Sequence, residues 1–333
     1  MPGGAGVRRP DHQTTTCSAA AVLAPYLHEQ AADFLRGLRL HQEHSTPTDA
    51  GGPGAEEATA ALRQAARRIS GALHTFRAAL DPGWADHLRT ELAWLSGTLA
   101  REHAYATRLG RLLEALHQLS GAALPAARTG ALSAGGEERA ALGVGAARAG
   151  ALLERRLTLA RTRAHSAALQ ALGSSRFHAV ADAVALLASE VPLAPAAAGP
   201  ASEVLHDPAL RAEQRLLAAV AALPPDESAE PYNEARDAPW HQARLLLRLH
   251  RYAREVVHGA PDPVLTGAGH ALDLHRDAAE AATAAASAAR TPRIAPATAY
   301  ALGVLHADQR HEVEAARAEF RGAWPYTAAV TAS

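Results

Sequence analysis

Lysine is absent from this chain of 333 residues, so the 33 residues of its lysine-plus-arginine total are all arginine. The absence excludes a catalytic Schiff-base lysine and a phosphate-loop lysine. Cysteine occurs once, at Cys17, which excludes an internal disulfide, a zinc ribbon and an iron–sulfur cluster. A chain without disulfides fits a reducing compartment, and we expect a cytoplasmic protein.

Aromatic residues make up only 4% of the chain and β-branched residues are few, whereas alanine supplies much of the 48% hydrophobic share. This composition argues against a sheet protein and favours helices packed closely through small side chains. No charge-free apolar run of about 18 residues occurs in the sequence, so we expect no membrane span. Arg8 and Arg9 are not followed by the apolar run of a signal peptide, and residues 1–17 are predicted to be a disordered lead-in.

Segments between proline- and glycine-rich breaks predict helices along almost the whole chain. The predicted helices are 18–44, 56–80, 84–99, 102–119, 137–172, 176–190, 203–223, 240–257, 264–289 and 297–324. Ser18, Asp81 and the pair Ser174-Ser175 are the predicted caps, with Pro82 at the first helical position after Asp81. The fold class is therefore all-α. We expect two pseudo-symmetric antiparallel bundles, 18–190 and 201–325, which form one compact unit with a central basic groove.

A stripe of basic residues follows one side of the predicted helix 240–257. His241, Arg244, Arg248 and Arg251 stand at i, i+3, i+7 and i+10, which places them within about 80° of the helix circumference. The predicted packing face beside the stripe is Leu245, Leu249, Tyr252, Ala253 and Val256. Glu255 is the only acid in the run, and like charges in a row cost roughly a few tenths of a kcal/mol per pair. Because the net charge of the chain is only -1, this local segregation points to a polyanion.

A second stripe lies in the segment 60–76. Arg63, Arg67, Ser70 and His74 share one face, and Arg68 lies about 100° round from Arg67. A shift of 181 residues (244 minus 63) lays Arg63 on Arg244 and Arg67 on Arg248, which indicates an internal duplication. Each bundle is thus expected to lend one arginine helix to a shared cleft. Arginine-rich faces are also commonly solvated surface, and in a lysine-free chain this alternative stays open for each stripe.

At these residues the chain resembles the CHAD family, the histidine-bearing α-helical domains that bind inorganic polyphosphate. The segment 241–252 resembles the second copy of the family signature, and the segment 63–76 resembles the first copy. The likeness continues in 92–99, in 272–278 and in 300–325, and it covers about residues 20–325. The resemblance implies polyphosphate binding without catalysis, in the cytoplasm and in association with polyphosphate granules. It implies the binding residues Arg63, Arg67, Arg68, His74, His241, Arg244, Arg248, Arg251 and His275.

The sequence departs from the family pattern mainly in the first copy. Ala60 stands where the family has its histidine, and Ser70 stands where a basic residue is usual. In the second copy, Leu249 replaces a basic residue and His250 an apolar one. The eroded first copy bears on the affinity for the ligand more than on the fold. Because histidine gains charge near pH 6.5, we expect tighter binding in mildly acidic solution.

Other functions have less support in the sequence. A phosphohydrolase needs carboxylates for magnesium, and the stripes are poor in acids. His275 and Asp277 point about 200° apart on a helix, so Asp277 is expected to orient a histidine or arginine on a facing helix rather than to share a metal. We expect no cofactor and no metal. Scarce aromatics disfavour nucleic acid as a partner. A helical scaffold or regulatory adaptor with a degenerate groove, acting on a protein partner, remains the alternative.

Overall fold

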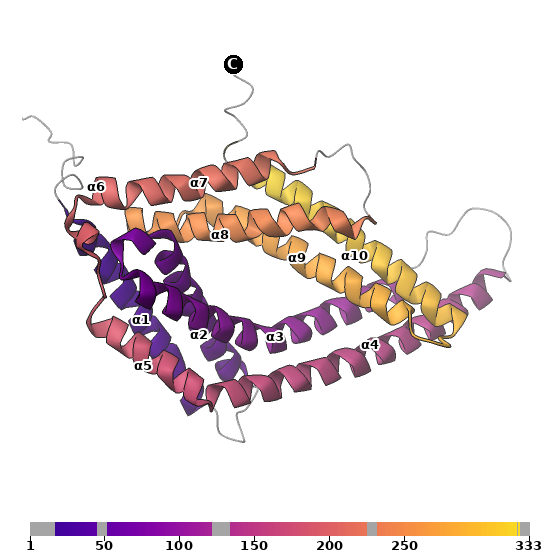
Figure 1. Ribbon diagram of the computed structural model, residues 1–333. Helices are drawn as coiled ribbons and strands as arrows, with labels where there is room; N and C mark the ends of the chain where they lie inside the picture. Colours follow the sequence, from indigo (N-terminus) through magenta and orange to yellow (C-terminus); the bar gives the residue numbers. More distant parts are fainter. Residues whose placement is uncertain (1–16, 45–51, 122–133, 225–231, 325, 327–333) are drawn as a thin grey trace, which may run out of the picture. The chain divides into compact units, whose positions relative to one another are not determined.

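The computed structural model describes residues 17–44, 52–121, 134–224, 232–324 and 326. Within these ranges the fold is all-α, as predicted, and extended backbone pairs only in two isolated bridges, Ser18 with Pro200 and Leu80 with Leu193 (Figure 1). Residues 1–16 of the predicted lead-in lie outside the described residues. In the described part of the chain, no helix combines the length and the apolar character that a membrane span needs.

The helices follow the predicted segments closely. The α-helices are α1 Ala19–Glu43, α2 Pro53–Thr75, α3 Pro82–Gly121, α4 Ala134–Leu172, α5 Ser175–Ser189, α6 Ala201–Val204, α7 His206–Ala221, α8 Ala238–His258, α9 Pro263–Ala289 and α10 Pro296–Ala323. The short 3₁₀ helices are η1 Arg77–Ala79, η2 Pro195–Ala198 and η3 Glu234–Asp237. Two predicted helices, 84–99 and 102–119, are one continuous helix, α3. Helix α4 also runs without a break through Gly143 and Gly145.

Three predicted caps are confirmed by hydrogen bonds at helix starts. The Ser18 hydroxyl accepts from the backbone N–H of Ala21 at 3.3 Å, and the Ser174 hydroxyl accepts from that of Phe177 at 3.2 Å. The Asp81 carboxylate accepts from the backbone N–H of Trp84 at 2.7 Å. Each cap satisfies a donor that the first helical turn leaves without an intrahelical partner.

The chain divides into two compact units that are discontinuous in sequence. Unit 1 comprises Met1–Gly97, Ala171–Ala218 and Leu246–Asp262, and unit 2 comprises Thr98–Gln170, Ala219–Leu245 and Pro263–Ser333. The predicted bundles 18–190 and 201–325 therefore each contribute to both units. The division falls inside helices, so that α8 carries residues of both units. The pseudo-symmetry and the shared cleft stay predictions.

The core of unit 1 forms where α1 packs against α2 and α5. Leu23, Leu27 and Phe34 of α1 are fully buried, as are Ile69 of α2 and Val184 of α5. The spacings of four and seven residues within α1 give this helix an apolar stripe that faces the core.

The core of unit 2 is built largely from alanine, as the composition suggests. Ala281, Ala285 and Ala288 of α9 are fully buried in a cluster with leucines of α3, α4 and α10. Helices α9 and α10 lie side by side (Figure 1). Small side chains allow such close helix packing because the backbones can approach one another.

Candidate functional site

Eight of the nine basic residues singled out in the sequence are partly exposed to solvent. These eight are Arg63, Arg67, Arg68, His74, His241, Arg244, Arg248 and Arg251. The ninth, His275, is 1% exposed. The α2 residues, together with Arg248 and Arg251 of α8, belong to unit 1, whereas His241 and Arg244 belong to unit 2. Each unit thus presents basic side chains of its own to solvent.

His275 lies in the interior of unit 2, against the start of α8. Its ring stacks on Trp240 at 5.5 Å between ring centroids and meets the ring of His241 at 5.4 Å. Burial, helped by the charge of Arg317, lowers the pKa of His275 from 6.5 to about 3. The residue is therefore neutral at physiological pH, and neighbouring side chains cover its ring almost completely.

The acid nearest to His275 is Asp237, which the sequence analysis missed. Asp237 is 6% exposed, and one of its carboxylate oxygens is 3.8 Å from Nε2 of His275. Arg310 donates to both oxygens of Asp237, at 2.7 and 3.1 Å, and Arg317 donates to Oδ1 at 2.5 Å. Arg310 is 0% exposed and Arg317 is 5% exposed. Two buried guanidiniums therefore share one buried carboxylate, and Arg317 also donates to Oε1 of Glu314 at 2.7 Å.

Some signal for this cluster was present in the sequence. Arg310 and Arg317 are seven residues apart, so they share one face of a helix. Asp237 lies in η3, directly before α8, in a stretch that looks like a polar connection. By contrast, the expected role of Asp277 is wrong, because that carboxylate accepts from Nε of its chain neighbour Arg276 at 2.9 Å and not from a facing helix.

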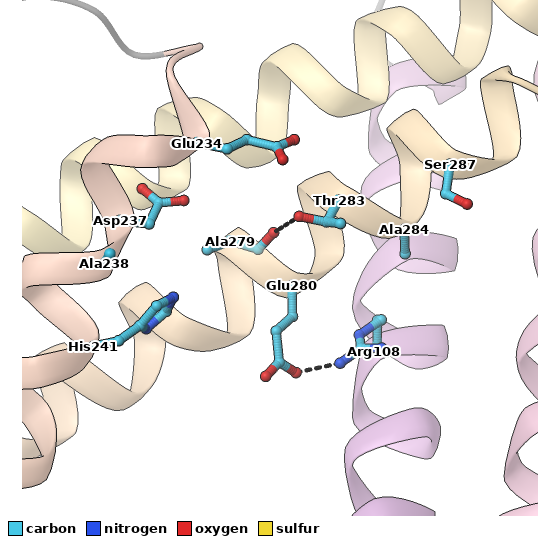
Figure 2. Close-up of a pocket in the computed structure, with 10 residues that line it drawn as sticks. All are labelled: Arg108, Glu234, Asp237, Ala238, His241, Ala279, Glu280, Thr283, Ala284 and Ser287. Carbon is cyan, nitrogen blue, oxygen red and sulfur yellow. Dashed lines mark hydrogen bonds and ion pairs between the residues drawn. The ribbon is translucent and has the colours of Figure 1, made fainter.

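A cavity of about 400 Å³ opens beside Asp237 and His241 in unit 2 (Figure 2). Asp237, Glu234 and Glu280 contribute three carboxylates to its lining, against the basic groups of Arg108 and His241. Arg108 is itself paired with Glu280, as the dashed line in Figure 2 marks. This lining of mixed charge is unsuited to a polyanion.

Arg244, one residue of the α8 stripe, is bound to α9 of the same unit. Its Nε donates to Oδ1 of Asp273, and the Arg244 side chain is only 14% exposed. The Asp273 side chain is 52% exposed, so water reaches the pair from the side of the acid.

Arg68 has a comparable role in unit 1, where α2 packs against the second part of α8. Its Nε donates to Oε2 of Glu255 at 2.8 Å, and the Tyr26 hydroxyl donates to the same oxygen at 3.4 Å. Burial and the charge of Glu255 raise the pKa of Tyr26 above its usual range. A Cβ at Gly71 would lie 2.6 Å from the ring of Tyr252, so glycine is needed for this close approach of the two helices.

The predicted packing face of α8 is wrong in part. Leu245 is 45% exposed, whereas Leu247 is 1% and His250 is 2% exposed. Burial lowers the pKa of His250, so the histidine packs in its neutral form. His250, together with Trp240 at the helix start, shifts the buried face away from Leu245, and a pattern of apolar residues alone does not include a buried histidine.

The pKa values of the two partly exposed histidines of the stripes, His74 and His241, are also lowered. Burial is the main cause that lowers the pKa of His241, with Arg244 acting in the same direction and Asp237 opposing. Burial, followed by the charges of Arg89 and Arg215, lowers the pKa of His74, and Asp86 opposes them. Both rings are therefore neutral near pH 7.

Comparisons with known proteins agree on one family. The sequence model of the CHAD domain family matches residues 29–271. A solved structure, PptA from Streptomyces chartreusis, is similar with 58% sequence identity and a TM-score of 0.77. The similarity covers 92% of this chain and 99% of that one. A search of curated proteins found no match.

Proposed function

This chain belongs to the CHAD domain family, and on that premise we propose that it binds inorganic polyphosphate, or a similar linear polyanion, without catalysing a reaction on it. The observation that carries the proposal is the partial exposure of eight basic side chains on α2 and α8. Acids are scarce on the same helices: α2 has none after Glu57, and Glu255 is the only one in α8.

Guanidinium groups of both stripes are the proposed direct ligands of the polyanion. Arg63, Arg67, Arg248 and Arg251 are proposed to bind phosphate oxygens directly, because a guanidinium donates two parallel hydrogen bonds and is always protonated. Arg68 and Arg244 already hold carboxylates of the protein, so they add positive charge only in part. His275 is proposed to support the ring of His241.

The two partly exposed histidines are proposed to strengthen binding in acid. Because the pKa of His74 and that of His241 are lowered, their charges develop below pH 6.5 in the free protein. A polyanion favours the protonated rings, so affinity is expected to rise as the pH falls from 7 toward 5.5. Equal affinity across this range would remove both histidines from the proposed site.

A second candidate, a helical adaptor whose groove no longer binds polyphosphate, is favoured by the same two ion pairs. Arg68 with Glu255 and Arg244 with Asp273 satisfy part of the basic charge inside the fold. In an adaptor, partly exposed arginines of α2 and α8 would meet acids of a protein partner.

Titration separates these functions. The protein is titrated with long-chain polyphosphate, with orthophosphate and with single-stranded DNA, and phosphate release is assayed in the presence of magnesium. The proposal expects tight binding of polyphosphate alone, and no release of phosphate. Absence of polyphosphate binding would leave the adaptor, and release of orthophosphate would establish a phosphohydrolase. A fluorescent fusion of the full chain tests the proposed association with polyphosphate granules in the cytoplasm.

A further inference from the structure

A second cavity lies wholly within unit 1, between the C-terminal end of α2 and the exposed side of α7. Its volume is about 510 Å³, and it is lined by His74, Thr75, Pro208, Arg211, Gln214, Arg215 and Ala218. Cavities of about 300–1,000 Å³ are typical of small-ligand sites. Of the basic residues that the sequence analysis singled out, only His74 belongs to this lining.

The lining carries hydrogen-bond donors and positive charge, and it contains no carboxylate. Arg211 and Arg215 are four residues apart, so they share one face of α7, and both side chains are exposed to solvent. Thr75 Oγ1 is buried and makes no hydrogen bond in the structure. A buried hydroxyl without a partner costs free energy, and a ligand oxygen in the cavity would satisfy it.

The charges around His74 come from two further helices. Arg215 of α7 and Arg89 of α3 both act on the imidazole, and Asp86 of α3 is the acid that opposes them. Asp86 is already paired with Arg77 at 2.7 Å and with Arg89 at 3.7 Å. The surroundings of His74 are therefore cationic on balance. Such surroundings stabilise a dianionic phosphate group.

We propose that this cavity of unit 1 binds the terminal phosphate group of a polyphosphate chain, with Arg211 and Arg215 as its principal ligands. The inference rests on the proposed function, because it assigns the end of the same polymer to a site of its own. A terminal group has three free oxygens and up to two negative charges, whereas an internal group has two free oxygens and one charge. Donors on α2 and on α7 suit the larger set, with the two guanidiniums on one side and the Thr75 hydroxyl and His74 on the other.

Linear tripolyphosphate and cyclic trimetaphosphate test this proposal, because the cyclic compound has no terminal group. We expect the wild-type protein to bind the linear compound more tightly than the cyclic one. The double variant Arg211→Ala/Arg215→Ala is expected to bind tripolyphosphate about tenfold more weakly, as for the loss of a charged hydrogen bond, and to lose most of this preference. The control Arg39→Ala/Arg290→Ala removes the same charge from exposed positions on α1 and directly after α9 and should keep the preference.

The outcomes separate this inference from the proposed function. If the wild type binds neither long-chain polyphosphate nor tripolyphosphate, the proposed function fails. If long-chain polyphosphate binds, but the variant and the control show the same preference for the linear compound, the cavity is not an end-group site and the proposed function stands. An equal loss for both compounds in the Arg211→Ala/Arg215→Ala variant would show that the two arginines act by charge alone, which also overturns the end-group assignment.

A charge-conserving variant sharpens the readout. Arg211→Lys/Arg215→Lys keeps both positive charges but loses the bidentate fork of the guanidinium. We expect it to bind trimetaphosphate as the wild type does and tripolyphosphate several-fold more weakly. Circular dichroism of each variant confirms the fold, which these exposed side chains should not affect.

Discussion

The arginines of α10 and those of the α8 stripe are the same residue type at similar helical spacing, yet they occupy opposite environments. Arg310 and Arg317 are almost completely buried and share the buried carboxylate of Asp237. Arg248 and Arg251 are partly exposed on a helix with a single acid. In a chain without lysine, burial rather than residue type therefore distinguishes a structural arginine from a candidate ligand.

The largest expected effect is a loss of stability when the carboxylate partner of the buried arginines Arg310 and Arg317 is removed. Asp237→Ala removes the buried carboxylate that Arg310 and Arg317 share, and the loss of one partner of a buried ion pair costs about 3–5 kcal/mol. We expect the free energy of unfolding, measured with urea at pH 7, to fall by that amount. Asp86→Ala, which removes the exposed partner of Arg77, is the control and should change stability little. An equal loss in both variants would contradict the structural role of Asp237.

A smaller effect concerns the position of α10, which carries the two buried arginines. A Cβ at Gly145 of α4 would lie 2.4 Å from the backbone oxygen of Ala297 in the first turn of α10. We expect Gly145→Ala to destabilise the protein by about 1–3 kcal/mol, because the helices must move apart. Gly143→Ala, where a Cβ meets nothing within 4 Å, should instead stabilise α4 by up to about 1 kcal/mol. Opposite shifts in Tm would confirm this packing, and shifts of the same sign would contradict it.

Glu255 shares features of both groups of arginine environments, because it is a buried acid on α8, the helix that carries the partly exposed arginine stripe. We expect Glu255→Gln to lower stability by about 1–2 kcal/mol, less than Asp237→Ala, since the Arg68 side chain is 19% exposed and reaches water. Removal of the negative charge should at the same time strengthen polyphosphate binding. The two effects are measured by urea unfolding and by titration, and weaker binding by the variant would contradict the assignment of α2 and α8 to the site.

The smallest effect is the pH dependence of stability due to His275. Because the pKa of this buried ring is lowered to about 3, its stabilising contribution is complete above the unfolded value of 6.5 and is lost as the pH falls below it. At pH 5.5 the loss relative to pH 7 is about 1 kcal/mol for one such histidine. His275→Phe should make the unfolding free energy less dependent on pH by this amount. The same slope in the variant would show that folding does not lower the pKa of His275.

Local features of the fold were predictable from the sequence, and long-range polar pairing was not. Ser18, Asp81 and Ser174 cap helices through residues three positions away, so the signal and its partner stand together in the sequence. Asp237 instead meets arginines 73 and 80 residues further along the chain. Which acid pairs with which arginine depends on how the helices pack, and the spacing within one helix carries no information on it.

For the candidate site too, the helical faces were predictable from the sequence, whereas the contacts between helices were not. Helical spacing placed Arg63, Arg67, Arg248 and Arg251 on partly exposed faces, because periodicity fixes which residues share a face. It could not indicate that His275 is buried or that Arg244 holds Asp273, since both depend on contacts with other helices. The cavity beside Arg211 and Arg215 was also not apparent, since it forms between segments far apart in the sequence.

The salt dependence of polyphosphate affinity tests the central claim most directly. By analogy with single-stranded nucleic acids, each phosphate contact contributes about 0.7 to the slope of log affinity against log salt concentration. For Arg248→Ala/Arg251→Ala, we predict weaker binding and a slope shallower by about 1.4 than that of the wild type. The control Arg39→Ala/Arg290→Ala should keep both the affinity and the slope of the wild type. If the stripe variant and the control give the same affinity and the same slope, the arginine stripe of α8 does not bind the polyanion.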